Sequence, residues 1–297
     1  MYTVDEVKES NFSFLELKDS NNTAKAIIYL DEGGRLQELK FKDIFLIKEQ
    51  PNFEYKDSYA SSILFPFVSR IKEGKYLFQE KEYQLNCNQT GDNALHGLVY
   101  NKKFELISKE ENTNFCAVTI AYKETEVSKG FPYTYEIYAT YTLSKNGISL
   151  SIKIKNTDSK TYPFTLGWHP YFLSDDISKS SLRFKSDQKI EFDKSLITKK
   201  VIDHKTEEEF KIEEKQLDDC FILNSDAFQF KTPTYQIEIS TDKKENYLQL
   251  YTPKGLSIIA IEPMTGISNS FNNKIGLQVL APNETYAITW TVKLMNN

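Results

Sequence analysis

The stretch YEIYATYTLSKNGISLSIKIK, residues 135–155, indicates the fold class of this chain of 297 residues. Residues 135–143 are rich in aromatic and β-branched side chains, which favour strands. The second part alternates apolar with polar residues, at Ile148, Leu150, Ile152 and Ile154 against Ser149, Ser151, Lys153 and Lys155. Alternation with a period of two is typical of a half-buried strand. Residues 144–147 (SKNG) carry Asn-Gly turn chemistry, so the stretch predicts a β-hairpin.

Similar short runs recur along the whole chain. They lie at 26–30, 83–85, 117–122, 162–166, 235–239, 247–251, 257–261 and 287–294, separated by loops of Asn, Asp, Lys and Gly. Residues 203–217 are the nearest to a helical pattern, but their apolar positions are few, and we interpret them as a polar excursion between strands. No linker, heptad or internal repeat divides the chain. The pattern predicts an all-β protein, a large antiparallel β-sandwich or barrel, with residues 1–297 in a single domain.

Composition excludes several classes of partner. The chain has 37 Lys plus Arg against 42 Asp plus Glu, a net charge of −5 and a pI near 5.5. A nucleic-acid partner needs a clustered positive surface, so none is expected. Residues 1–12 contain acids and no apolar core, unlike a secretory signal. The longest apolar runs, 63–68 and 256–261, are too short to span a bilayer, so we expect no membrane association.

Cysteine usage and missing motifs narrow the class further. Cys87, Cys116 and Cys220 are an odd number without a CxxC pair, which fits a reducing, cytoplasmic compartment. The sequence has no GxGxxG, Walker A, HExxH or GxSxG motif. We therefore expect no cofactor and no metal. Nothing in the sequence indicates an oligomeric state.

The three histidines differ in their surroundings. His169 lies in TLGWHPYF, where Pro170 should end a strand and leave the imidazole at a sheet margin among aromatic rings, although a satisfied core histidine would look the same. His96 lies in NALHGL before Gly97, which permits close backbone approach to a ligand; an ordinary turn histidine is the alternative. His204 lies among charged residues and is expected in solvent.

One guanidinium and three carboxylates stand out. Arg70 ends a largely apolar run and needs either a carboxylate of the fold or a polar ligand for its donors. Glu262 follows the very apolar run 256–261, so it is either ion-paired or a functional base with a raised pKa. Asp218 and Asp219 border a polar loop, and only one of them can easily face a given side; a turn or loop cap is the alternative. With the two imidazoles, this set suits proton shuttling on a polyhydroxylated substrate.

Six segments of the chain resemble the aldose 1-epimerases, or sugar mutarotases, and occur in that family's order. They are LFPFVSRIKEGKYLFQEKEYQL (64–85), NALHGL (93–98), GFPYTYEIYATYTL (130–143), PFTLGWHPYF (163–172), LDDCF (217–221) and IEPMTG (261–266). GWHPYF and IEPMTG are the more specific of them. The resemblance implies a galactose-mutarotase-like β-sandwich, or supersandwich, that interconverts the α and β anomers of a free aldose such as glucose or galactose without a cofactor.

The resemblance also implies roles for five residues. Glu262 would be the general base that removes the proton of the C1 hydroxyl, and His169 the general acid that protonates the ring oxygen. His96 would hydrogen-bond near the ring oxygen. Arg70 would donate hydrogen bonds to sugar hydroxyls, and Asp218 would accept them.

Departures from the family pattern concern the substrate. Ser69 precedes Arg70 where Asn or Gly is commoner, and Gly97-Leu98 follows His96. Asp219 could replace Asp218. The HPYF form also resembles branches that act on hexose 6-phosphates, for which Lys72 and Lys75 are candidate phosphate ligands. A glycoside hydrolase or lyase using two carboxylates, or a non-catalytic sugar-binding module, are further alternatives on the same fold.

Overall fold

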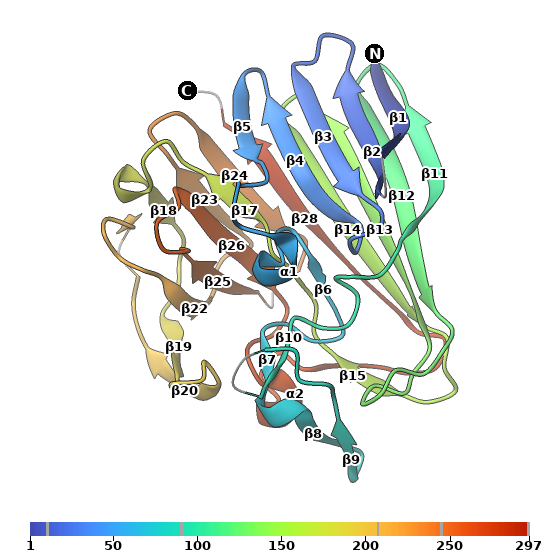
Figure 1. Ribbon diagram of the computed structural model, residues 1–297. Helices are drawn as coiled ribbons and strands as arrows, with labels where there is room; N and C mark the ends of the chain where they lie inside the picture. The colour runs from blue at the N-terminus through green and yellow to red at the C-terminus, as the bar shows by residue number, and fades with distance from the viewer. Residues whose placement is uncertain (10–11, 90–91, 207, 244–245, 296–297) are drawn as a thin grey trace.

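The computed structural model describes residues 1–9, 12–89, 92–206, 208–243 and 246–295, and most of them lie in antiparallel sheets (Figure 1). The longest sheet of the described residues has nine strands. Their order is β11 (Glu105–Glu111), β12 (Phe115–Glu124), β13 (Tyr135–Ser144), β14 (Gly147–Asn156), β28 (Thr285–Leu294), β24 (Gln236–Thr241), β23 (Ala227–Lys231), β18 (Ser181–Arg183) and β21 (Phe210–Lys211).

The predicted hairpin forms two interior strands of this sheet and is confirmed. Strands β13 and β14 pair from Tyr135–Asn156 to Ser144–Gly147, and inward side chains are buried along both. The turn is Lys145-Asn146, so Gly147 is the first strand residue and not a turn residue as predicted. A Cβ on Gly147 would lie 2.6 Å from the carbonyl oxygen of Val292, so close packing against β28 is what requires glycine here.

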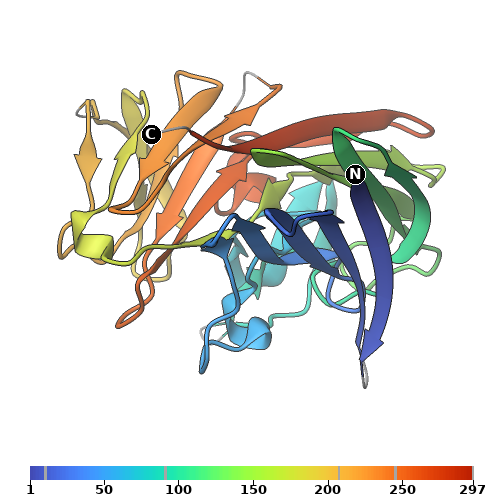
Figure 2. The same cartoon turned by 90° about the horizontal axis from the view of Figure 1, so that it is seen from above.

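Two further sheets cover one side of the long sheet (Figure 2). The N-terminal sheet contains five strands within the described residues and lies against β11, β12 and β13. Their order is β1 (Tyr2–Glu9), β2 (Phe12–Asp19), β3 (Ala24–Tyr29), β4 (Arg35–Phe41) and β5 (Ile44–Ile47). One continuous core joins the sheets: it includes Leu17 of the N-terminal sheet and Leu150 of the long sheet.

The remaining large sheet carries the candidate site. Within the described residues it has the order β20 (Thr198–Asp203), β19 (Gln188–Phe192), β22 (Asp218–Ile222), β25 (Tyr247–Tyr251), β26 (Ile258–Met264), β16 (Gly167–Trp168) and β6 (Ile63–Leu64), with β17 (Tyr171–Leu173) also paired to β26. Leu250 and Ile261 point into the common core. Because side chains alternate along a strand, Gln249 and Glu262 point to the opposite face.

Short elements complete the described part of the fold. They are the strand pairs β7 (Arg70–Ile71) with β10 (Ala94–Leu95), β8 (Lys75–Phe78) with β9 (Lys81–Gln84), and β15 (Tyr162–Phe164) with β27 (Gln278–Leu280), and the one-turn helices α1 (Tyr55–Ser58), η1 (Lys72–Gly74), η2 (Ile177–Lys179) and α2 (Ser270–Asn273). None of the helices formed by the described residues is long and apolar enough to cross a membrane.

The all-β antiparallel sandwich predicted from the sequence is therefore confirmed. The predicted polar excursion at 203–217 contains only the short strand β21 after the end of β20, apart from residue 207, which lies outside the described residues.

Candidate functional site

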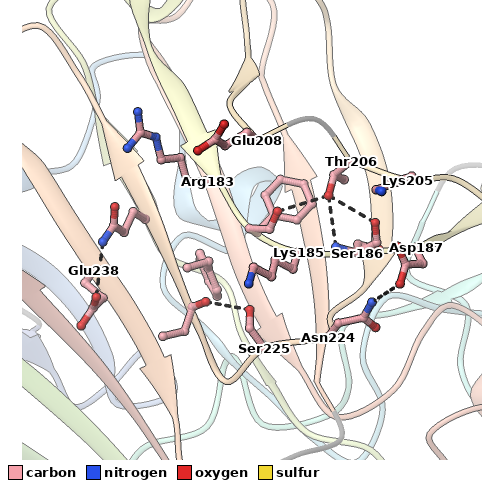
Figure 3. A pocket seen from close by; sticks show the side chains of 14 residues that line it. Arg183, Lys185, Ser186, Asp187, Lys205, Thr206, Glu208, Asn224, Ser225 and Glu238 are labelled. Carbon is pink, nitrogen blue, oxygen red and sulfur yellow. Dashed lines mark hydrogen bonds between the residues drawn. The ribbon is translucent and has the colours of Figure 1, made fainter.

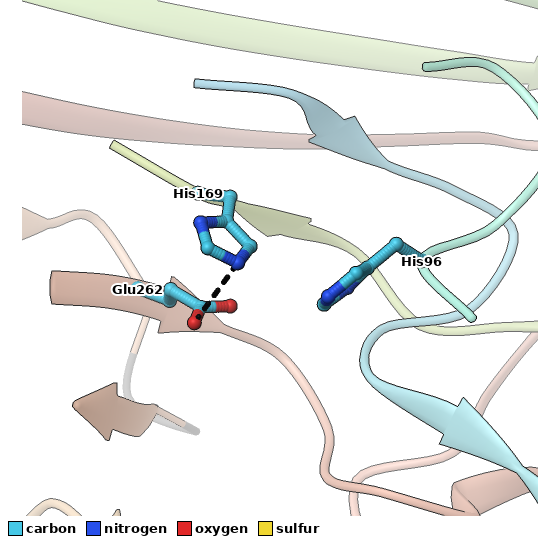
Figure 4. A group of neighbouring side chains, drawn as sticks. All are labelled: His96, His169 and Glu262. Carbon is cyan, nitrogen blue, oxygen red and sulfur yellow. Dashed lines mark ion pairs between the residues drawn. The ribbon is translucent and has the colours of Figure 1, made fainter. Parts of the chain in front are cut away.

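The register of β26 with its neighbours places His169 opposite Glu262. Gly167 pairs with Met264 and Tyr171 with Ala260 on the same side of β26, so the residue midway between Gly167 and Tyr171 faces Glu262. Both side chains are nearly fully buried, at 4% and 2% relative exposure. His169 Nε2 lies 3.3 Å from Glu262 Oε1, within reach of a direct proton transfer (Figure 4).

His96 reaches toward this pair from a separate loop (Figure 4). Its ring centroid lies 5.0 Å from that of His169, with the two planes nearly perpendicular at 82°. The Nδ1 atoms of both histidines are buried and have no hydrogen-bond partner within the described part of the chain. We call His96, His169 and Glu262 the acid–base cluster.

Arg70 and His96 come from the small β7–β10 pair beside the main sheet. Leu95 pairs with Arg70, and the His96 amide donates to the carbonyl oxygen of Ser69 at 2.8 Å. Gln89 Oε1 accepts a hydrogen bond from Arg70 Nε at 2.9 Å. The guanidinium forms no ion pair with the described residues within 4.0 Å.

Of the two adjacent aspartates, Asp218 faces the cluster. It pairs in register with Tyr251 of β25, and its Oδ1 accepts a hydrogen bond from Gln249 Nε2 at 2.7 Å. Asp219 points to the other side of the strand, where its Oδ1 lies 3.5 Å from Lys189 Nζ. The strand alternation therefore separates two residues that the sequence leaves equivalent.

A cavity of about 300 Å³ brings the five predicted site residues together. Its wall includes Arg70, His96, His169, Asp218 and Glu262, together with Tyr59, Ser69, Gln89, Tyr171, Leu196, Gln249 and Tyr251. Sequence reasoning missed most of the second group. Gln249 was detectable in principle, because it is the one polar residue of the apolar strand YLQLY, residues 247–251.

Burial dominates the electrostatics of the cavity. Desolvation raises the pKa of Glu262 well above its ordinary value, and the nearby Asp218 carboxylate adds to this, while Arg70 opposes it. Desolvation lowers the pKa of His169 to about 4. Both shifts favour the uncharged forms at the 3.3 Å contact, a carboxyl group beside a neutral imidazole, over an ion pair.

The other groups respond to the same environment. Desolvation, then His169 and Arg70, keep the pKa of His96 well below its ordinary value, so His96 is neutral. Desolvation raises the pKa of Asp218 against the opposing effect of Arg70. Both carboxyl groups thus keep protons to higher pH than exposed acids, which is common where acid–base chemistry occurs.

Comparison with known proteins identifies the family. The family model for aldose 1-epimerase matches residues 15–293, almost the whole chain. The chain belongs to the aldose 1-epimerase family.

Relatives within the aldose 1-epimerases are distant in sequence but similar in fold. An uncharacterized protein of Escherichia coli K12, YihR, is 24% identical over 273 residues, 88% of this chain and 87% of that protein. Human galactose mutarotase is 24% identical over 180 residues, 59% of this chain and 50% of that protein. A galactose mutarotase-like protein from Clostridium acetobutylicum superposes with a TM-score of 0.89 at 19% identity, covering 100% of this chain and 99% of that one.

A second cavity of this aldose 1-epimerase family member, about 690 Å³, is larger but lacks such chemistry (Figure 3). Its polar side chains mostly bond one another or the backbone: Asn224 donates to Asp187 at 2.6 Å, and the Thr206 hydroxyl contacts two carbonyl oxygens. Arg183, Lys185 and Lys205 share it with acids. We place the candidate site in the smaller cavity because its described wall holds a buried imidazole 3.3 Å from a buried carboxyl group.

Two predicted groups lie away from the candidate site. Neither Lys72 nor Lys75 belongs to the described wall of the 300 Å³ cavity, and Lys75 Nζ instead pairs with Glu73 at 2.9 Å. His204 is half-buried against Phe221 outside the cavity, with ring centroids 5.8 Å apart.

The acid–base cluster is also the place where a metal ion could bind. One potential ligand atom from each of its three residues lies within 4.8 Å of the others, and the His169–Glu262 distance of 3.3 Å already matches an edge of a tetrahedral site.

Proposed function

We propose that this protein is a cofactor-independent aldose 1-epimerase that interconverts the α and β anomers of an unphosphorylated hexose such as glucose or galactose. The observation that carries the proposal is the 3.3 Å contact between His169 Nε2 and Glu262 Oε1 in the wall of the 300 Å³ cavity. We also propose that residues 1–297 form one domain in the cytoplasm, a view that the continuous core and the three free cysteines support.

The proposed reaction uses one proton shared by His169 and Glu262. With the proton on His169, the Glu262 carboxylate removes the proton of the C1 hydroxyl while the imidazolium protonates the ring oxygen. The C1–ring-oxygen bond breaks and a C1 carbonyl forms. The former ring oxygen now carries the His169 proton, and Glu262 holds the proton taken from the C1 hydroxyl. After rotation about C1–C2, the same transfers in reverse close the ring on the other face of the carbonyl.

Burial of the pair suits this cycle. The neutral arrangement, protonated Glu262 with neutral His169, is the form required for ring closure, and desolvation favours it in the sugar-free protein. The charged arrangement required for ring opening differs only by a proton moved across the 3.3 Å contact. Positioned acid–base catalysis contributes about 10²–10⁴-fold.

The cavity supports an unphosphorylated monosaccharide as the substrate. Its volume of about 300 Å³ lies at the small end of ligand pockets, which span ~300–1,000 Å³. Arg70 is the one Lys or Arg among the described residues of its wall, and it faces the carboxyl groups of Asp218 and Glu262. A phosphate dianion would meet these acids without a second cation, which disfavours a hexose 6-phosphate.

The alternatives fit the geometry less well. Glycoside hydrolases use two carboxyl groups, about 5–5.5 Å apart as acid and nucleophile or ~6.5–9.5 Å apart as acid and base, whereas here the direct partner of Glu262 is an imidazole. A sugar-binding module would not need an acid and a base buried against each other, because such burial costs stability without adding hydrogen bonds to a ligand.

Anomer exchange tests the proposal. Polarimetry and NMR exchange spectroscopy on glucose, galactose and glucose 6-phosphate should show rates above the spontaneous one on at least one free hexose, and a lower kcat/KM on the phosphate. A protein that binds a hexose without accelerating exchange would be a binding module, and a protein active only on glucose 6-phosphate would overturn the assignment of the substrate.

A further inference from the structure

The side-chain amide of Asn88, next to the cavity, makes the two hydrogen bonds to a strand edge that a neighbouring strand would make. Asn88 Oδ1 accepts a hydrogen bond from the Leu95 amide at 2.7 Å, and Asn88 Nδ2 donates to the Leu95 carbonyl oxygen at 3.1 Å. Leu95 lies in the two-residue strand β10, whose other edge is bonded to β7. Asn88 thus satisfies both outward backbone groups of Leu95, as a neighbouring peptide unit would in a wider sheet.

His96 directly follows Leu95, so the Asn88 bonds also restrain its backbone. Its backbone has φ 58°, in the left-handed region that is unfavourable for a non-glycine residue. Such a conformation persists only where the surroundings impose it. The Asn88 bonds to Leu95 on one side and the His96–Ser69 backbone bond on the other supply that constraint, and so direct the imidazole into the cavity.

Asn88 also reaches the ring that packs on His96. Its Nδ2 donates to the hydroxyl of Tyr59 at 3.2 Å, and the Tyr59 and His96 rings lie 5.0 Å apart. One exposed amide therefore joins the backbone before His96 to the aromatic wall beside it. Solvent could replace these bonds, but it would not fix their geometry.

The following residue performs a parallel task for Arg70. Gln89 Oε1 accepts from Arg70 Nε at 2.9 Å, which orients the planar guanidinium and leaves its two terminal nitrogens for a ligand. Both Arg70 and Gln89 line the cavity. The consecutive residues Asn88 and Gln89 therefore hold two different site residues through two separate contacts.

We propose that Asn88 and Gln89 are paired positioning residues: Asn88 fixes His96 for the chemical step, and Gln89 fixes Arg70 for sugar binding. The kinetic part of this inference rests on the proposed epimerase function. It assigns different consequences to neighbouring positions, because His96 lies against the acid–base pair whereas Arg70 lies at the wall among hydroxyl-binding groups.

The kinetic test compares three alanine variants. Asn88→Ala should lower kcat about tenfold with KM within about twofold, because small displacements of a catalytic group reduce the rate strongly. Gln89→Ala should raise KM about three- to tenfold with little change in kcat, the size expected for one lost hydrogen bond. Gln89→Glu, which still accepts from Arg70 Nε, should restore KM.

Asn112→Ala is the matched control. Asn112 also bonds backbone amides, those of Asn114 and Phe115, but in the β11–β12 turn. Its variant should match the wild type in both parameters. Equal effects of Asn88→Ala and Asn112→Ala on kcat, or a shared loss of stability without a split between kcat and KM, would overturn the proposal.

A readout independent of activity separates this inference from the proposed function. With only three histidines, imidazole NMR spectra resolve each ring. In Asn88→Ala the His96 resonances should shift or broaden while those of His204 stay unchanged, even if the wild type proved inactive on every sugar. Unchanged His96 resonances would refute the role of Asn88, and absent wild-type catalysis would refute only the proposed function.

Discussion

Replacement of Glu262 by glutamine tests both the chemistry and the electrostatics of the site. The side chain is 2% exposed, and glutamine has nearly the same shape and can still hydrogen-bond His169. It cannot accept the proton of the C1 hydroxyl. Loss of a positioned general base should lower kcat by about 10²–10⁴-fold, equivalent to ~2.7–5.4 kcal/mol in the barrier.

The same substitution should raise stability at neutral pH. Burial raises the pKa of Glu262 in the folded state above the ordinary value of 4.5, so above pH 4.5 the folded protein keeps a proton that the unfolded chain releases. The unfolding free energy of the wild type therefore falls as pH rises, by up to about 1.4 kcal/mol per pH unit until the folded-state pKa is reached. Glutamine has no such proton. The gain in unfolding free energy of Glu262→Gln over the wild type should therefore be absent below pH 4.5 and grow above it.

His169 should change the stability of the protein with pH in the opposite direction to Glu262. Its pKa falls from 6.5 to about 4 on folding, so this group destabilises the protein progressively as pH falls from 6.5 toward 4. This loss at acid pH should remain in Glu262→Gln, whereas the loss at higher pH should disappear. Calorimetry from pH 4 to pH 8 measures both the loss of stability at acid pH and the loss at higher pH.

Anomer exchange by NMR and calorimetry on the same samples complete the test. A Gln variant within about threefold of the wild-type rate would refute Glu262 as the base. If Glu262→Gln is less stable than the wild type and this difference is larger at pH 7.5 than at pH 4.5, the proposed effect of burial on Glu262 is refuted.

Three further predictions follow from the site and its supports. Asp218→Asn should raise KM about ten- to a hundredfold, the range for a charged hydrogen bond, whereas Asp219→Asn should leave kinetics unchanged because Asp219 faces Lys189; equal effects would contradict the strand alternation. Zn²⁺ should inhibit the enzyme in competition with the sugar, and EDTA should reverse this inhibition, because the acid–base cluster offers three metal ligands. Co²⁺ bound at the same place should show the d–d absorption bands of a tetrahedral site, whereas purely non-competitive inhibition would place the metal elsewhere. Gly97→Ala should lower the unfolding free energy in urea by more than about 2 kcal/mol, because φ is 80° and a Cβ would collide with the Phe65 carbonyl oxygen; a wild-type midpoint would show that this loop can move.

The fold class could be predicted because the alternation of apolar and polar residues that indicates strands lies within short stretches of sequence. Alternation of Ile148, Leu150, Ile152 and Ile154 with polar residues fixes strand and buried face at once, and the structure buries all four. The same reasoning misplaced Gly147 in the turn. Its role depends on β28, which lies about 140 residues later in the chain, and no local pattern reports such a contact.

The sequence by itself determined the chemical types in the candidate site: two imidazoles, a guanidinium and carboxylates at the ends of apolar runs. Tertiary structure alone decided which of them meet. His169 faces Glu262 because β16 and β17 share one register on β26, and Asp218 rather than Asp219 faces the cavity because neighbours on a strand point to opposite sides. The physical reason is that register and burial arise from long-range pairing, and burial in turn sets the pKa values on which the proposed chemistry depends.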